Sequence, residues 1–573
     1  MASNEERPIC RLSHPTQPHS LSRRAGKVPP SGCFACDKDE FSPASTFHYC
    51  CTTCDVEFHE FCHRYPKKLT HPYHLQHPLT LSTQNTEIEI KPGYIFKECN
   101  WCGDDLRDGS QFYRCLICNF CLDLSCSQNI PTLTITNPKS HHHSLSLFPW
   151  PLLFPCEACG LISLLEPSYA CFQCNYMVHE SCIDLPRVVK ITRHPHRLSH
   201  TPFLPATTLL CKVCYKKVDI KYGQYSCNQE SCSYVAHSKC ATHMHVWDGR
   251  ELEWEPEEDE DEDVASFKRV GDDMIKYFCH EHHLKLEKYD SVRDAKKQCE
   301  ACILRIDSYD FYNCKQCEFS LHEECADLPR KLAHALHRHP LVLETSPILD
   351  YNSAGCSTCA RESTGFRYKC SRNDCDNEIQ IDVRCVLVPD CFIHKSHEHP
   401  LFISTSYSRK GNISCNGCKD SVRDEYYLQC TICAFAMCYR CATIPDEIHY
   451  KYDAHPLSLC YGEGEEKEAY WCEVCEKEVN PREWFYKCNK CCITIHLECI
   501  FGSSVYIKPG YTFYFGSESM KIIGNSSNTR PICFKCDHRC PHSVYYKLFE
   551  KDFCSWFCVW TSDIENCNNS ESE

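Results

Sequence analysis

One pattern of cysteine and histidine recurs along this chain and limits what it can fold into. In its clearest copy, Cys299-x2-Cys302 is followed by Cys314-x2-Cys317-x4-His322-x2-Cys325. These thiolate and imidazole groups stand at the spacing that tetrahedral zinc sites require. The first Cys pair also begins at Cys33, Cys99, Cys156, Cys211, Cys356, Cys415 and Cys472. The chain is therefore predicted to be a tandem array of eight small modules.

The density of cysteine leaves two ways to stabilise such modules. The chain has 54 Cys among 573 residues, which indicates either a secreted disulfide scaffold or a reduced, metal-bound protein. The first seven residues are polar and lack the apolar stretch of a secretory signal. No run approaches the ~18 apolar residues of a membrane helix. Because the 33 His stand at regular offsets from the Cys, we expect metal sites, in a cytoplasmic or nuclear compartment that keeps thiols reduced.

Modules of this size need a metal, a disulfide or a neighbouring module to fold. Most steps between the first Cys pairs of successive units are 55 to 61 residues long, and such units bury too little apolar surface to hold themselves together. Structural zinc contributes an apparent folding free energy of about 10–16 kcal/mol in small finger peptides. The predicted fold class is therefore a tandem array of small zinc-stabilised α+β modules.

Charge and composition divide the array. The acidic run from Glu251 to Asp263 repels itself and predicts an extended linker between two groups of four modules, with an acidic docking segment as the alternative. The predicted division is a disordered N-terminus (1–13), modules at 14–71, 72–140, 141–194 and 195–246, the acidic linker (247–277), modules at 278–336, 337–396, 397–452 and 453–509, a C-terminal four-cysteine zinc site (510–565) and a disordered tail (566–573).

Inside each module the pattern predicts short strands followed by a brief helix. A Tyr stands two residues before the third Cys in seven units, and apolar residues alternate after the fourth Cys, as at Phe319 and Leu321. We expect these side chains to form the small core between the metal sites, not a platform for stacking ligands. Leu328-Pro329 and its equivalents end each unit, because Pro cannot continue a helix interior.

Each unit is predicted to supply ligands for two tetrahedral sites. It opens with His-x-Leu, continues with two Cys pairs and usually His-x2-Cys, and in most units closes with a later His. The opening ligands are His19, His77, His143, His196, His282, His339, His399 and His455, and the closing ligands are His71, His141, His194, His334, His394 and His449, with His243 and His245 as alternatives in unit four.

The remaining predicted ligands follow the same order in each unit. They are Cys33, Cys36, Cys51, Cys54, His59 and Cys62; Cys99, Cys102, Cys115, Cys118, Asp123 and Cys126; Cys156, Cys159, Cys171, Cys174, His179 and Cys182; Cys211, Cys214, Cys227, Cys232, His237 and Cys240; Cys299, Cys302, Cys314, Cys317, His322 and Cys325; Cys356, Cys359, Cys370, Cys375, Asp382 and Cys385; Cys415, Cys418, Cys430, Cys433, Cys438 and Cys441; Cys472, Cys475, Cys488, Cys491, His496 and Cys499.

Several units depart from the pattern. Asp123 and Asp382 stand where other units have the central His, with Cys121 as a rival ligand beside Asp123, and Cys438 makes one site all-thiolate. Unit eight has no evident closing ligand. Four further Cys, with Cys540 as a rival, predict one more site: Cys533, Cys536, Cys554 and Cys558. The Cys that fit no site are expected to be free thiols: Cys10, Cys50, Cys279, Cys391, Cys460, Cys492 and Cys567.

This order of ligands resembles that of the C1 domain. The residue pattern of the whole repeat resembles the divergent C1 (DC1) repeat of plant Cys/His-rich proteins over nearly all of residues 14–509. The resemblance implies about two Zn²⁺ per module in an interleaved arrangement. In unit five, one metal would take His282, Cys314, Cys317 and His334. The other would take Cys299, Cys302, His322 and Cys325.

The resemblance and the repeat together predict a non-enzymatic zinc scaffold that binds other proteins, in plant signalling or stress response. Recognition of diacylglycerol or another lipid headgroup, which some C1 domains perform, is the first alternative. The short, charged loops between the Cys pairs do not favour it. Thiol-disulfide exchange is the second alternative, because C-x2-C is also the thioredoxin motif, but no βαβ setting is visible. A net charge of −16 disfavours nucleic acid as a partner.

Overall fold

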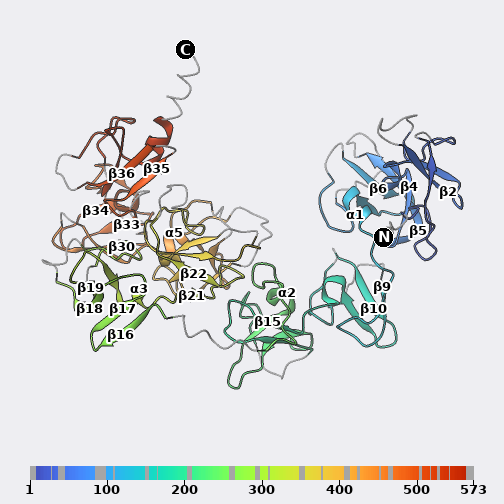
Figure 1. Ribbon diagram of the computed structural model, residues 1–573, viewed down its shortest axis with the longest axis horizontal. Coiled ribbons are helices and arrows are strands. Elements are labelled where there is room, and N and C mark those ends of the chain that lie inside the picture. Colours follow the sequence, from blue (N-terminus) through green and yellow to red (C-terminus); the bar gives the residue numbers. More distant parts are fainter. Residues whose placement is uncertain are drawn as a thin grey trace, which may run out of the picture.

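The fold was examined in a computed structural model, in which small sheet-containing modules follow one another along the chain (Figure 1). The structure describes residues 8–26, 29–36, 46–83, 98–106, 110–148, 154–163, 166–202, 209–256, 265–290, 297–306, 310–347, 355–375, 379–404, 413–421, 426–450, 453–462, 469–501, 506–515, 518–525, 530–540 and 542–562. The most acidic part of the predicted linker, Cys567 and the predicted tail lie outside these residues.

A small antiparallel sheet followed by about one helical turn is the recurring unit. In module three the strand order is β11-β10-β9-β8, and Tyr169 of β10 (Ser168–Cys171) pairs with Val178 of β11 (Tyr176–His179). Both side chains are buried, as the period-two alternation predicts for a half-buried strand. The edge strand β8 (Thr134–Ile135) precedes the first His of the module. The connection from the preceding module therefore completes the next sheet.

The same arrangement repeats with small changes of length. In the first half the remaining elements are β1 (Ser22–Ala25), β2 (Phe47–Cys51), β3 (Val56–His59), η1 (Cys62–Arg64), β4 (Lys68–His71), β5 (His74–Thr83), β6 (Gln111–Cys115), β7 (Cys121–Asp123), α1 (Leu124–Gln128), β9 (Leu145–Phe148), η2 (Glu180–Cys182), β12 (Val188–Val189), β13 (Leu198–Thr201), β14 (Gln224–Cys227), β15 (Val235–His237) and α2 (Ser238–Ala241).

The second half contains β16 (Phe267–Gly271), β17 (Met274–Tyr277), β18 (His283–Lys288), β19 (Asp310–Cys314), β20 (Ser320–His322), α3 (Glu323–Ala326), β21 (Lys331–Leu332), β22 (Leu341–Glu344), β23 (Arg367–Cys370), β24 (Gln380–Asp382), α4 (Val383–Val386), β25 (Cys391–Phe392), β26 (Leu401–Ile403), β27 (Tyr427–Cys430), β28 (Ala436–Cys438), α5 (Tyr439–Ala442), β29 (Glu447–His449), β30 (Pro456–Cys460), β31 (Tyr470–Trp471), β32 (Glu478–Val479), β33 (Phe485–Lys487), β34 (Thr494–His496) and α6 (Leu497–Phe501). The C-terminal unit has the sheet order β35 (Thr512–Phe515), β36 (Glu518–Gly524), β37 (Val544–Leu548) and β38 (Lys551–Phe553).

The Tyr that precedes the third Cys joins neighbouring modules. Its hydroxyl donates a hydrogen bond to a backbone carbonyl of the connection that follows the preceding module. In four modules the acceptor belongs to the Pro that ends the preceding unit, and in module three it belongs to the residue after that Pro. The pairs are Tyr113 with Pro66, Tyr169 with Thr132, Tyr225 with Pro186, Tyr368 with Pro329 and Tyr486 with Pro445.

The two halves of the array differ in how their modules pack. Each of modules one to four has its own cluster of buried side chains. From Ile275 to Phe501, buried side chains form one continuous core across modules five to eight. Figure 1 shows the same contrast, with β9–β10 and α2–β15 in separate modules and strands β16 to β34 gathered in one body.

Module four contacts this body in spite of the acidic run between them. The Arg193 side chain is buried at this contact and donates to the backbone carbonyls of Val213 and Ala335, at 3.3 Å in each case. The Tyr215 hydroxyl donates to the Asp390 carboxylate at 2.9 Å, and its ring stacks on Phe402. The predicted division into two groups of four therefore does not describe the packing.

A segment after module eight ties the body together. Tyr506 and Ile507 are buried, and the backbone oxygen of Tyr506 accepts a hydrogen bond from Thr364 N at 3.1 Å. Lys508 pairs with Glu300 of module five. This segment therefore spans modules five and six. None of the helices in the described part of the chain is long and apolar enough to cross a bilayer.

Candidate metal centres

Each module brings its donor atoms together in two groups. The inner centre combines the first Cys pair with the central ligand and the last Cys. In module five these are Cys299, Cys302, His322 and Cys325, with His322 Nδ1 at 3.3 Å from Cys302 Sγ and 4.0 Å from Cys325 Sγ. The sheet carries His322 at the end of β20, and the following helical turn α3 carries Cys325. The local fold therefore brings together residues that are close in sequence.

The outer centre combines the second Cys pair with two groups at or before the start of the strand that pairs with the strand leading to the third Cys. In module five Cys314 Sγ lies 3.7 Å from His282 Nδ1, and Cys317 Sγ lies 3.6 Å from His280 Nε2. The strand β18 begins directly after His282 and pairs with β19, which ends at Cys314. The first Cys pair thus belongs to the inner centre and the second Cys pair to the outer centre, which is the interleaved order that the resemblance implies.

The spacing of the donors fits tetrahedral zinc. With Zn–S bonds of about 2.3 Å and Zn–N bonds of about 2.0 Å, the donors of a tetrahedron lie about 3.5–3.8 Å apart. The Sγ atoms of Cys36 and Cys62 lie 3.8 Å apart, and Cys159 Sγ lies 3.6 Å from His179 Nδ1. Five groups of Cys and His have all their donor atoms within 4.8 Å of one another, and the described residues contain 12 more such groups of Cys, His, Asp or Glu.

The sequence prediction of the closing His is wrong. His334 accepts a hydrogen bond from the backbone N–H of Leu336 and does not join Cys314 and Cys317, whose partner is His280. The physical reason is that the chain after the last Cys enters the edge strand of the next sheet and leaves its own module behind. The closing His therefore lies at the start of the next module, too far along the chain to reach the outer centre of its own module.

The other closing His follow the same correction. His71 contacts Asn129 O and Trp101, His394 stacks on Trp484, His449 ends the exposed edge strand β29, and His243 and His245 stack on each other. His141 and His194 do join metal centres, but those of the modules that follow them. The outer centres are Cys10, His19, Cys51 and Cys54; His74, His77, Cys115 and Cys118; His141, His143, Cys171 and Cys174; His194, His196, Cys227 and Cys232; His280, His282, Cys314 and Cys317; His337, His339, Cys370 and Cys375; His397, His399, Cys430 and Cys433; Asp453, His455, Cys488 and Cys491.

Sequence reasoning missed the first ligand of most outer centres and assigned His141 and His194 to the preceding modules, although a signal for this ligand exists. In modules three to seven a second His stands two residues before the opening one, giving His-x-His, as at His280 and His282. The ring of this first His stacks on the aromatic residue two positions after the fourth Cys in five modules. The stacked pairs are His74 with Phe120, His141 with Tyr176, His194 with Tyr234, His280 with Phe319 and His397 with Phe435.

The first and last modules replace this His by other groups. Cys10, expected to be a free thiol, is buried and its Sγ lies 3.8 Å from Cys54 Sγ. Residues 8–13 are therefore part of module one and do not belong to a disordered N-terminus. In module eight Asp453 Oδ1 lies 3.3 Å from Cys491 Sγ and supplies the ligand that the sequence seemed to lack.

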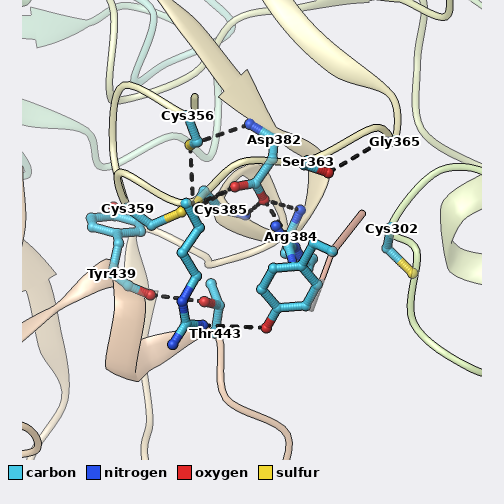
Figure 2. A network of polar contacts seen from close by, with 12 residues as sticks. Cys302, Cys356, Cys359, Ser363, Gly365, Asp382, Arg384, Cys385, Tyr439 and Thr443 are labelled. Atoms are coloured by element: carbon cyan, nitrogen blue, oxygen red, sulfur yellow. Dashed lines mark hydrogen bonds and ion pairs between the residues drawn. The ribbon is translucent and has the colours of Figure 1, made fainter. Parts of the chain in front are cut away.

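Carboxylates also take the place of the central His in modules two and six. Asp123 Oδ2 lies 3.1 Å from Cys102 Sγ, while the rival Cys121 instead donates to the Glu98 carbonyl. In module six Asp382 Oδ2 lies 3.2 Å from Cys359 Sγ. Figure 2 shows the Asp382 carboxylate directed toward Cys359 and Cys385, with Arg384 beside it.

Charge balance explains how the buried carboxylate is tolerated. Burial would raise the pKa of Asp382, but the positive charge of Arg384, whose Nε lies 3.2 Å from Asp382 Oδ1, lowers it well below its ordinary range. The Arg384 guanidinium also lies over the ring of Tyr506. Module six therefore balances the extra negative charge of a three-Cys, one-Asp centre with an internal cation.

Two centres consist of thiolates alone. Cys418 and Cys438 lie 3.8 Å apart in module seven. In the C-terminal unit Cys554 Sγ lies 3.7 Å from Cys536 and 3.5 Å from Cys558. The rival Cys540 is buried in the core of this unit. Cys279, Cys391 and Cys492, which were predicted as free thiols, are exposed.

The pKa values indicate that metal binding must expel protons. Burial lowers the pKa of His322, but the Cys299 and Cys302 thiolates outweigh burial and raise it to about 11. The same pair raises the pKa of the Cys325 thiol. A metal ion in this centre would replace those protons, because thiolate and neutral imidazole are the forms that bind zinc. In the outer centre of module six, burial lowers the pKa of His337 to about 4, so this imidazole is already neutral.

Comparison with known families gives the same periodicity. A family model described as C1 domain matches residues 72–127, 139–183, 192–241, 278–326, 335–386, 395–442 and 450–500. A second, described as C1 domain-like, C-terminal, matches residues 520–559. Each of the seven C1 segments begins just before the first ligand of an outer centre and ends just after the last Cys of the inner centre. Curated proteins and solved structures gave no match.

Proposed function

Because this chain belongs to the C1 domain family and is a zinc-binding, multi-module protein, we propose that it is a non-enzymatic scaffold that binds other proteins along its array. Each module would hold two Zn²⁺, and the C-terminal unit one more. We place the protein in a reducing compartment, since only reduced thiols ligate the metal. A role in signalling is the context in which such a scaffold would act.

The observation that carries this proposal is the closed character of the centres. Every centre described above has four protein donors, and a zinc ion with four protein ligands keeps no open position for a substrate or an activated water. Such a metal supports folding and takes no part in catalysis. The modules expose different side chains on a repeated frame, as arrays that bind partners along an extended surface do.

Native mass spectrometry of freshly purified protein tests the metal content. We expect two zinc ions per module and one in the C-terminal unit. One zinc per module would contradict the two-centre assignment. A zinc-free but folded protein would contradict the proposal itself.

Two assays then separate the scaffold from other activities. The zinc-loaded protein is expected to stay in the supernatant with vesicles of phosphatidylcholine, with and without diacylglycerol, and to be inactive in an insulin-reduction assay. Sedimentation only with diacylglycerol would favour a lipid reader, and insulin reduction would favour an oxidoreductase.

A further inference from the structure

The inner and outer centres differ in their access to solvent in modules three, five, seven and eight. In module three the inner ligands Cys156, Cys159, His179 and Cys182 are all at most 1% exposed, whereas Cys174 of the outer centre is exposed. The equivalent Cys, the fourth of its module, is also exposed in three other modules, as Cys317, Cys433 and Cys491.

The two centres also differ in their contribution to the core. In module three the inner Cys156, Cys159 and Cys182 all belong to the buried cluster, whereas of the two outer Cys only Cys171 does. In module five the inner Cys299, Cys302 and Cys325 belong to the continuous core, together with the outer Cys314 but not Cys317. Loss of an inner metal would therefore disturb more of the packed interior than loss of an outer metal.

In three modules a hydrogen bond supports the inner histidine, whereas Nε2 of the inner His179 in module three is buried without a hydrogen-bond partner in the described part of the chain. The nitrogen that faces away from the centre contacts a backbone carbonyl in modules four, five and eight: His237 Nε2 with Lys217 O at 3.1 Å, His322 Nε2 with Arg305 O at 3.3 Å and His496 Nε2 with Glu478 O at 3.1 Å. Within the part of the chain that the structure describes, Nε2 of the outer His143, His282 and His455 has no such partner. Removing such supporting contacts typically costs about 10–100-fold in metal affinity.

The charge of the centres points the same way. Three thiolates and one His around Zn²⁺ leave a net charge of −1, whereas two thiolates and two His leave the centre neutral. The inner centre in most modules thus offers one more thiolate, the softer and stronger donor for zinc. An incoming ligand reaches the exposed sulfur of an outer centre without unfolding the module.

We propose that the outer centres hold exchangeable zinc, which they give to and take from nitrogen- or sulfur-donating acceptors in solution while the inner centres keep the modules folded. The array would then act as a zinc reservoir with one labile ion per module, most readily in modules three, five, seven and eight. This inference rests on the zinc loading proposed above. Module six, whose outer His337 and His339 are buried, is expected to exchange slowly.

The test is chelator competition on the full-length, zinc-loaded chain. Zinc transfer to 4-(2-pyridylazo)resorcinol is followed by absorbance, and N-ethylmaleimide labelling of each Cys is mapped by mass spectrometry at the same times. We expect two phases that differ at least about tenfold in rate. In the fast phase Cys174, Cys317, Cys433 and Cys491 are labelled while the circular dichroism of the protein is unchanged. A single phase, or labelling of Cys182 as early as Cys174, would overturn the inference.

A matched pair in module three locates the labile ion. Cys174→Ser should remove one zinc from the fast phase, and Cys182→Ser one from the slow phase. If Cys182→Ser does not fold, the unsubstituted protein and Cys174→Ser still decide. If Cys174→Ser lost its zinc ion from the slow phase and not from the fast phase, the assignment would be contradicted. A low zinc count before chelator is added would refute the proposed function, whereas a full count released in one phase would refute only the exchange.

Discussion

The Tyr225 hydroxyl of module four donates a hydrogen bond to the backbone carbonyl of Pro186 at the end of module three. Both residues belong to the repeat: the Tyr precedes the third Cys of a unit, and the Pro ends the unit before. The bond is buried, so neither group can turn to water instead. The residues that form the core and the end of each unit thus also fix how one module meets the next.

Replacing Tyr225 by Phe should loosen the junction between modules three and four. The Pro186 carbonyl would stay buried without a donor, which costs about 1–3 kcal/mol. Hydrogen exchange of the connection 184–198 should become faster, and limited proteolysis should cut there first. Tyr49→Phe is the matched control, because its ring packs on His63 of its own module and, in the described residues, its hydroxyl donates to no connection between modules. Equal effects of the two substitutions would show that the hydroxyl matters only within its own module.

The parts of the fold that follow from short sequence distances could be predicted. His322 and Cys325 are three residues apart on one strand end and helical turn, so their spacing alone indicates one centre. The outer centre could not be assigned this way, because His280 and His334 both lie within reach of Cys317 along the chain. Only the direction of the edge strand after the last Cys decides between them.

Contacts between distant modules were even harder to predict from the sequence. Arg193 and Asp390 are nearly 200 residues apart, and neither belongs to the repeated pattern. The acidic run after Glu251 indicated a separating linker, but a few buried contacts outside that run bring module four onto the following body. Cys10 was missed for a related reason, since it stands nine residues before His19 and not two.

Zinc counting distinguishes the observed outer centre from the predicted one. His280→Ala should lower the zinc content by one ion, because Cys317 loses its imidazole partner at 3.6 Å. His334→Ala should leave the content unchanged, since that ring contacts the backbone of Leu336. Native mass spectrometry of both variants measures the difference. Loss of zinc in His334→Ala alone would restore the closing-His assignment.

Cys10→Ser should likewise remove one zinc, from module one. The serine hydroxyl is a poor substitute for a thiolate beside Cys54, and the N-terminal segment would lose its anchor. Cys50→Ser is the control, because Cys50 stands next to the ligand Cys51 but donates to the Ser22 carbonyl instead. We expect Cys50→Ser to keep the full zinc count, and a loss there equal to that of Cys10→Ser would contradict the assignment.

Arg193→Ala should release module four from the body formed by modules five to eight. The substitution removes a hydrogen bond to the Ala335 carbonyl across the contact, a second one to the Val213 carbonyl within module four, and a cation 3.9 Å from Asp390. Charged donors of this kind contribute about 1.5–3 kcal/mol each when buried. Small-angle X-ray scattering should report a larger radius of gyration, and cross-links between module four and residues 388–402 should disappear.

The control for this variant is Arg187→Ala, in which the Arg lost is an exposed one that pairs with Glu253. Because exposed ion pairs contribute little, it should scatter like the unsubstituted protein. Zinc content should be the same in both variants, since neither Arg contacts a metal centre. An unchanged radius of gyration in Arg193→Ala would mean that the stacking of Tyr215 on Phe402 suffices to hold module four in place. In that case Tyr215→Ala, and not Arg193→Ala, should release it.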